Sequence, residues 1–457
     1  MEGAPKMPAV DVPAWLENHK ISFVQILVLL LCAATAGLDG FDAQVIGYVA
    51  PAVIRELGVP VAAFTPVFVA GLAGMLAGGL FIAPLADWIG RKQVLLWSAT
   101  FFGAMSLATA FSHSLETLTL LRFLTGIGLG ASLPTAIALT AEYFPSRNRA
   151  TMTMMMFTGF PIGAGLGGLL ASSLIKSNGW RSVFFAGGVL PLALAILLAV
   201  ALPESVRYLA RKGKHARVKT ILERISHHAS FPDTTDFIVP EESAEGLTVR
   251  HLFREGRALG TVMLWLMFFV GLLDVFFLSS WLPQVLTDAG LTISSAAAAT
   301  AVLQGGGVIA ALSTGWLVDR YGFAAVLLPL FLGAALWIAL LGFAGNSEPL
   351  IFLASFLAGA SVIGGQTAVN VLAAAFYPTY MRATGIGWAL GLGRGGSIVG
   401  PVIGGVMITL QWSRPALFVA AAIPALFGAL AVVVMTRTSG DKLAVAAPTR
   451  RAFEKWG

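Results

Sequence analysis

The feature that most limits the possible folds of this chain is its series of long apolar segments separated by short polar loops. A helix needs about 20 apolar residues to cross a bilayer. Only 11% of the residues are charged, against about 25% in soluble domains, so the sequence predicts an all-α membrane protein. Twelve segments reach the length of a transmembrane helix: 21–50, 64–86, 93–112, 116–142, 151–175, 181–202, 259–285, 294–318, 323–345, 349–376, 384–409 and 414–436.

The hydrophilic stretch 203–258 divides these segments into two groups of six. It is rich in Lys, Arg, Glu and His, and we expect a cytoplasmic linker with one or two short surface helices. The predicted domains are therefore an N-terminal six-helix bundle (1–202), this linker, and a C-terminal six-helix bundle with a cytoplasmic tail (259–457). The first apolar segment is too long for the core of a signal peptide, so we expect it to remain as a spanning helix.

Two pairs of loops show an internal repeat. Residues 85–92 (LADWIGRK) resemble 317–322 (LVDRYG), and 144–151 (FPSRNRAT) resemble 377–384 (YPTYMRAT). The offset is 232 to 233 residues in both pairs, and the halves have the same orientation because each holds an even number of spans. Parallel repeats of this kind are typical of secondary transporters whose site lies between the halves. The sequence thus predicts two pseudo-symmetric bundles.

The basic residues predict the orientation. If the N-terminus is cytoplasmic, the outside loops hold only four of the 29 Lys and Arg residues. These four are Arg55, Lys176, Arg181 and Arg414. Two more lie inside spans, and all the others fall on the cytoplasmic side, as the positive-inside rule requires. We expect a protein of the cell (inner) membrane with both termini in the cytoplasm. The net charge of +6 then reflects this orientation in the lipid bilayer and not the binding of a nucleic acid.

Asp39 and Asp42 lie in the first span, in what the predicted boundaries make its outer half. An ionised carboxylate deep in a bilayer costs about 2.5–3.5 kcal/mol on insertion scales. Residues three apart share a helix face, so the pair is expected to face a protein cavity and to take up protons as a unit. The alternatives are a structural role in helix packing or an ion pair that closes an outer gate. Arg122, in the outer part of the fourth span, is expected opposite Asp39, as a proton-released partner or as a permanent bridge.

Arg394 lies at mid-depth in the eleventh span and has no acid in its own helix. Its fork of donors suits a carboxylate, so we expect it to bind an anionic substrate; the alternative is an ion pair with Asp274. Other candidate substrate contacts are neutral polar or aromatic groups, which can equally well join helices or pack. They are Gln304, Gln366, Asn370, Trp281 and Phe41.

Charged residues at the inner loops form a candidate inner gate. Their alternative role is solvation and topology. In the first half they are Asp87, Arg91, Glu142 and Arg149, and in the second half Asp319, Arg320 and Arg382.

Several chemistries are excluded by missing patterns. The sequence has no G-x-x-x-x-G-K-[ST] phosphate loop, no His/Cys metal spacing, and no nucleophile–base arrangement of an enzyme. We therefore expect neither a cofactor nor a metal, and an energy source other than ATP. The single cysteine, Cys32, is expected to serve helix packing.

The motifs resemble those of the major facilitator superfamily. Asp87-x-x-Gly-Arg-Lys, Gly315-x-x-x-Asp-Arg-x-Gly, Arg122-x-x-x-Gly-x-Gly and Pro203-Glu-Ser-x-Arg are its loop and span signatures. Two departures stand in the first loop, where Ala83 replaces the usual Gly and Trp88 the usual Arg.

Asp39-Gly-Phe-Asp42 and Gly393-Arg-Gly-Gly further resemble the aromatic acid:proton symporter family. The resemblance implies a monomeric importer of benzoate-type or hydroxybenzoate-type acids, coupled to protons, that works by alternating access and supplies aromatic catabolism. The alternatives are a carrier of another organic anion or a sugar, a drug exporter, and a membrane sensor.

Overall fold

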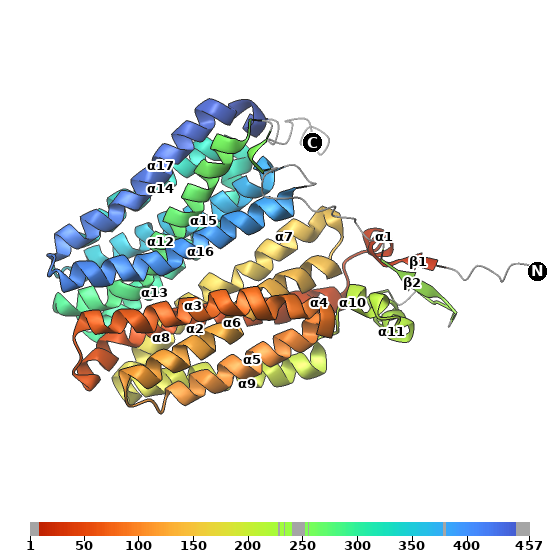
Figure 1. The fold of residues 1–457 in the computed structure, drawn as a ribbon, viewed down its shortest axis with the longest axis horizontal. Coiled ribbons are helices and arrows are strands. Elements are labelled where there is room, and N and C mark those ends of the chain that lie inside the picture. Colours follow the sequence, from red (N-terminus) through yellow and green to blue (C-terminus); the bar gives the residue numbers. More distant parts are fainter. Residues whose placement is uncertain are drawn as a thin grey trace, which may run out of the picture. The chain divides into compact units, whose positions relative to one another are not determined.

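The computed structural model describes residues 9–226, 229–232, 234–239, 252–254, 256–377 and 381–444. Nearly all of them are helical (Figure 1). The long helices are α2 (Phe23–Leu57), α3 (Thr65–Ala77), α5 (Arg91–Thr109), α6 (Leu115–Tyr143), α7 (Ser146–Phe157), α8 (Gly159–Asn178), α9 (Trp180–Ala201), α12 (Ala258–Asp288), α13 (Ile293–Tyr321), α14 (Phe323–Phe343), α15 (Glu348–Phe376), α16 (Arg382–Thr409) and α17 (Arg414–Ala444). Short helical turns η1 (Val61–Phe64), η2 (Gly78–Ile82), η3 (Ala83–Leu85) and α4 (Ala86–Ile89) flank or extend α3.

Eleven helical segments of the described chain are long and apolar enough to cross a membrane. They correspond to eleven of the twelve expected spans. The twelfth, α5, lies where the third span is expected but is not among the eleven; it is 19 residues long and begins with two basic residues. Its length and its packing against α6 still make it part of the helical bundle.

The first long helix is longer than the sequence predicts. The helix α2 continues past residue 50, through Pro51, to Leu57. Asp39 and Asp42 therefore lie midway along α2, whereas the predicted boundaries place them in the second half of the span.

The sequence repeat is also a repeat of structure. Gly90, between α4 and α5, and Gly322, between α13 and α14, both have a positive φ, of 109° and 83°. Such a backbone favours glycine because a Cβ is strained there. The helices α6 and α15 are each 29 residues long, and their ends differ by the same 233 positions that separate the loop motifs.

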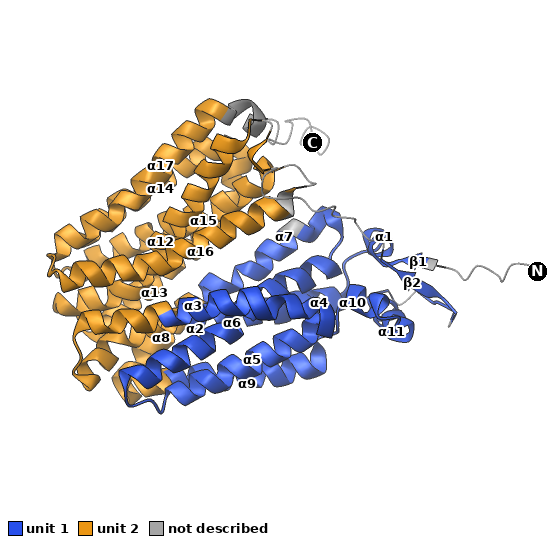
Figure 2. Cartoon of the chain, viewed as in Figure 1, with its two compact units in different colours: residues 1–43, 70–163, 184–243 blue, residues 44–69, 164–183, 244–457 orange. Residues whose placement is uncertain are grey.

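By its internal contacts the chain divides into two compact units (Figure 2). Unit 1 comprises residues 1–43, 70–163 and 184–243; unit 2 comprises 44–69, 164–183 and 244–457. The division cuts α2, α3, α8 and α9, so parts of the first six spans pack with the helices of the second six. The predicted domains, with boundaries at residues 202 and 259, follow the repeat instead and remain a prediction.

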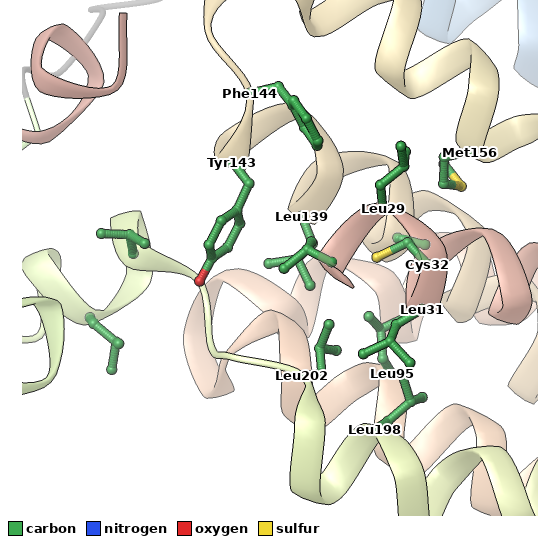
Figure 3. Packing of buried hydrophobic residues seen from close by; sticks show 14 of the residues in the cluster. Leu29, Leu31, Cys32, Leu95, Leu139, Tyr143, Phe144, Met156, Leu198 and Leu202 are labelled. Carbon is green, nitrogen blue, oxygen red and sulfur yellow. The ribbon is translucent and has the colours of Figure 1, made fainter. Parts of the chain in front are cut away.

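The core of unit 1 is formed by side chains from α2, α5, α6 and α9. Figure 3 shows Leu31 and Cys32 among Leu95, Leu139 and Leu198. All five are at most 4% exposed, and the burial of Cys32 agrees with its expected role in packing. The backbones of α2 and α8 are in direct contact, since a Cβ on Gly163 would overlap the carbonyl oxygen of Gly37.

In unit 2, small residues bring helix backbones into contact. A Cβ on Gly359 of α15 would overlap the carbonyl of Leu303 on α13, and one on Gly396 of α16 would overlap that of Phe269 on α12. The C-terminal part of α2 joins this unit in the same way, since a Cβ on Gly47 would overlap the carbonyl oxygen of Ser279. Small residues of this kind let membrane helices associate closely.

A small polar subdomain in unit 1 joins the start of the chain to the linker. The strand β1 (Ala9–Asp11) pairs in parallel with β2 (Asp236–Ile238). Around them lie α1 (Val12–Glu17), α10 (Val206–Arg211) and α11 (His215–Ile225). The helices α10 and α11 confirm the short helices expected in the linker.

Candidate functional site

A buried ion pair joins α2 to α6 in unit 1. Arg122 Nη1 lies 3.1 Å from Asp42 Oδ2, and the two side chains are 3% and 1% exposed. The other carboxylate oxygen, Asp42 Oδ1, accepts a hydrogen bond of 2.9 Å from Ser106 Oγ on α5. The sequence prediction of a carboxylate–guanidinium pair is correct, but its acid is Asp42 and not Asp39.

The guanidinium of Arg122 is held on further sides. Its Nη2 donates to Thr109 Oγ1 at 3.2 Å and to Thr125 Oγ1 at 3.0 Å. Its central carbon lies 4.8 Å from the centre of the Phe184 ring, a cation–π distance. Within the described residues its Nε has no hydrogen-bond partner, so one donor of the guanidinium is unused.

Asp39 has a different environment from Asp42. Ser132 Oγ of α6 donates a hydrogen bond to Asp39 Oδ2, while Oδ1 has no partner in the described part of the chain. The side chain is buried. The two acids of the first span therefore differ in their contacts. Asp42 neutralises an arginine, whereas Asp39 retains one unused acceptor oxygen.

Sequence reasoning missed the polar and aromatic groups that hold these three residues. The missed residues are Ser106, Thr109, Thr125, Ser132 and Phe184. A signal was present, because Ser106 and Thr109 of α5 are three residues apart and share a helix face. Isolated hydroxyl residues are common in membrane helices, however, so only the contacts distinguish these from the rest.

Arg394 on α16 has no ion-pair partner among the described residues. Its backbone carbonyl accepts a hydrogen bond of 2.7 Å from Ser397 Oγ, and its side chain is partly buried. The structure shows no ion pair between Arg394 and Asp274 among its described residues, and Asp274 Oδ1 has no hydrogen-bond partner there. The guanidinium remains available to an anion.

The other candidate substrate residues differ in how fully their polar groups are used. Gln304 Nε2 lies 3.4 Å from Ser279 Oγ, a long contact, and Gln366 Oε1 has no partner in the described chain. Asn370, partly buried, follows Gln366 by four residues on the same face of α15.

Two aromatic candidates pack against other helices. The Trp281 indole donates to Pro401 O at 2.8 Å, and its ring packs edge-on against Phe68 at 5.0 Å between centroids. Phe41 is buried against Gly187 of α9. Their part in a substrate wall remains a prediction.

An ion cluster lies at the C-terminal end of α6. Arg91 Nε is 2.7 Å from Glu142 Oε1 without the alignment of a hydrogen bond, and Arg91 Nη2 is 2.8 Å from Asp87 Oδ1. Ser205 Oγ also donates to Glu142. The structure thus brings Asp87, Arg91 and Glu142 together.

Arg149 borders a small hollow that Glu17 and Glu142 also line. Its Nε has no hydrogen-bond partner in the described residues. Glu17 instead accepts from the backbone N–H of Ser146, at the start of α7. The segment before α2, which is not part of the gate expected from the sequence, therefore reaches Glu142 and Arg149.

The second half lacks a comparable ion cluster in its described part. Asp319 and Arg320 are exposed in the last turn of α13, and the Arg320 guanidinium lies over Trp316 and Tyr321, 5.4 and 5.6 Å from their ring centres. The side chain of Arg382 lies outside the described residues. No group of three or more His, Cys, Asp or Glu that could hold a metal gathers in the part of the chain that the structure describes.

The sequence matches the Major Facilitator Superfamily over residues 32–388 and 264–456. The chain belongs to the major facilitator superfamily. It is a multi-pass membrane transporter with that fold rather than an enzyme, as expected. The xylose transporter XylE from E. coli, in a partially occluded inward-open conformation, has a similar structure, with a TM-score of 0.70 over 91% of this chain and 98% of that one at 17% identity.

Relatives in sequence are similar over nearly their whole length. A gallate transporter of Pseudomonas putida is 42% identical over 93% of this chain and 94% of its own. The 4-hydroxybenzoate transporter PcaK of Acinetobacter baylyi is 38% identical over 94% of this chain and 95% of its own. The benzoate transport protein of the same organism is 32% identical over 93% and 92%.

Proposed function

We propose that this protein imports an aromatic carboxylate together with protons across the cell inner membrane, as a monomer with both termini in the cytoplasm. The observation that carries the substrate class is the 42% identity to a gallate transporter along nearly the whole chain. The 4-hydroxybenzoate and benzoate transporters support the same class. Their substrates share an aromatic ring and a carboxylate.

Arg394 binds the substrate carboxylate in this proposal. Its guanidinium has no acid to neutralise it in the described chain, and its planar fork of donors matches the two oxygens of a carboxylate. A partly buried cation without a partner is costly in a membrane protein. An anion that enters the site offsets this cost.

Proton uptake is assigned to Asp39 and Asp42. In the ion pair each charge compensates the desolvation of the other. A proton on Asp42 removes its negative charge and releases Arg122, which then changes its partners. Asp39 lies three residues before Asp42, about 4.5 Å along the helix axis, and its Oδ1 has no partner in the described chain. It provides the neighbouring site from which a proton passes to Asp42.

The two halves, residues 1–202 and 259–457, alternate access around this site. The inner ion cluster of Asp87, Arg91 and Glu142 is proposed to close and open the cytoplasmic side, with Arg149, Asp319, Arg320 and Arg382 contributing. The distribution of basic residues supports the cytoplasmic placement of these loops.

Uptake into proteoliposomes tests the proposal. The purified protein is given radiolabelled gallate, 4-hydroxybenzoate, a sugar and an aliphatic dicarboxylate, with and without an inward pH gradient. We expect accumulation of the two aromatic acids only, several-fold higher with the gradient. Accumulation of the sugar or dicarboxylate instead would overturn the substrate class. Uptake that is independent of the pH gradient and of the membrane potential would overturn proton symport.

A further inference from the structure

The repeat gives Asp42 a counterpart in the second half. At the offset of 232 that relates the glycine turns, Asp42 of α2 corresponds to Asp274 of α12. At the offset of 233 that relates α6 to α15, Arg122 corresponds to Ser355. The second half thus keeps the buried acid of the coupling pair but has a hydroxyl in place of its base.

Asp274 is a buried acid. Its side chain is 2% exposed, and Oδ1 has no hydrogen-bond partner in the described chain. The same holds for Gln366 Oε1 on α15, which packs against α12. Buried polar atoms are almost always hydrogen-bonded, so unsatisfied acceptors indicate a ligand or water. Both atoms are acceptors, and each requires a donor.

The Gln366 acceptor lies one helix turn from Asp274. A Cβ on Gly271 would overlap Gln366 Oε1, so the amide oxygen lies directly against α12 three residues before Asp274. Gly271 corresponds to Asp39 at the offset of 232. The amide of Gln366 therefore occupies the place that the second carboxylate takes in the first half.

Arg394 of α16 lies beside the same part of α12 as the Gln366 amide. Its neighbour Gly393 packs against Phe268, and Gly396 packs against Phe269 and Leu273. The backbone of Arg394 is therefore beside the turn of α12 that precedes Asp274. One cation and two acceptors, all in unit 2, come from adjoining turns of three packed helices.

We propose that Asp274 and Gln366 accept hydrogen bonds from the ring hydroxyl groups of the substrate, which makes the protein selective for hydroxylated aromatic acids over unsubstituted ones. The inference rests on the proposed function, in which Arg394 takes the carboxylate. A carboxylate brings only acceptors and suits Arg394, whereas a phenolic hydroxyl brings the donor that Asp274 and Gln366 lack. An unsubstituted ring leaves both acceptors unpaired, and sites with polar groups left unpaired reject such analogues.

The test compares the affinities of benzoate, 4-hydroxybenzoate and 3,4,5-trihydroxybenzoate for the purified full-length protein, by competition against one labelled acid. Asp274→Leu and Gln366→Met remove the acceptors, and Asp274→Asn retains one. The control is Asp288→Asn, an exposed acid at the end of the same helix that accepts from Gln284.

We expect the hydroxylated acids to lose roughly ten- to a hundredfold in affinity in Asp274→Leu, and less in Asp274→Asn, while benzoate changes little. Gln366→Met should act in the same direction and the control should not. An equal loss for all three acids, or no loss, would overturn the inference while leaving the proposed function intact. A wild-type protein that binds none of the three acids would overturn both. Variants that fail to fold are replaced by Asp274→Asn, whose selectivity ratio decides the question in the same way.

Discussion

Asp42 and Arg122 form a hydrogen-bonded ion pair of 3.1 Å between α2 and α6, with both side chains buried. Asp39, one turn away on the same helix, has no cationic partner in the described chain and keeps one oxygen unsatisfied. Two acids that look equivalent in the sequence therefore differ in what their removal does to the rest of the site.

Asp42→Asn is expected to abolish proton-driven uptake and also to destabilise the protein. Removing one partner of a buried pair leaves an uncompensated charge on Arg122, at a cost of about 3–5 kcal/mol. Thermal unfolding of the purified protein should show a clear drop in Tm. The double variant Asp42→Asn with Arg122→Gln should recover stability but not coupling; an Asp42→Asn protein as stable as the wild type would contradict the pair's structural role.

Asp39→Asn is expected to abolish proton-driven uptake with little change in Tm. It retains an acceptor for Ser132 and unpairs no cation. Counterflow exchange of labelled substrate, which needs no net proton movement, should persist. If accumulation driven by a pH gradient stays at the wild-type level, Asp39 has no part in coupling.

Arg394→Ala is expected to raise the apparent KM for an aromatic acid tenfold or more, or to end transport. A charge-assisted hydrogen bond contributes about 1.5–3 kcal/mol, and the two-pronged contact of a guanidinium contributes more. Uptake kinetics measure the change. Arg437→Ala, an exposed arginine near the end of α17, is the matched control. Unchanged kinetics would place the carboxylate elsewhere.

Gly47→Val is expected to lower Tm and to stop transport. The added side chain overlaps the backbone of Ser279, which is not the far end of a side chain and cannot turn aside. The C-terminal part of α2 would then separate from α12. Gly305→Val on α13 is the control, since a Cβ there meets nothing within 4 Å. An equal drop in Tm for the two variants would show that valine itself destabilises these helices, and that the contact with Ser279 does not matter.

The contact between Glu17 and α7 is expected to weaken in acid. The backbone N–H of Ser146 holds the pKa of the Glu17 carboxyl below its ordinary value. Because the pKa of Glu17 is lowered in the folded protein, the contact is fully present above the ordinary pKa of the carboxyl. It is lost as the pH falls through the lowered pKa. Spin labels at positions 18 and 148, in a Cys32→Ala background, should move apart between about pH 7 and about pH 3. A Glu17→Gln variant should lack this pH-dependent step.

The sequence was enough to predict the helices and the repeat, because both depend on local patterns. Apolar length fixes where spans lie, and the glycine turns at 90 and 322 recur at one offset. It was not enough to decide which acid pairs with Arg122. Asp39 and Asp42 differ by one turn, and α2 extends seven residues beyond the expected end at Ala50. The contacts of Ser106 and Thr109 also depend on how α5 packs, which no local pattern encodes.

The parallel pairing of β1 with β2 has a consequence for biosynthesis. Its partners, such as Ala9 and Asp236, are more than 200 residues apart in the chain. The ribosome must release every span of the first half before the second strand exists, and contacts of such long range form late. We therefore expect the N-terminal strand to remain unpaired while the six spans of the first half insert into the membrane. The two-stranded sheet then forms only after this half has been translated.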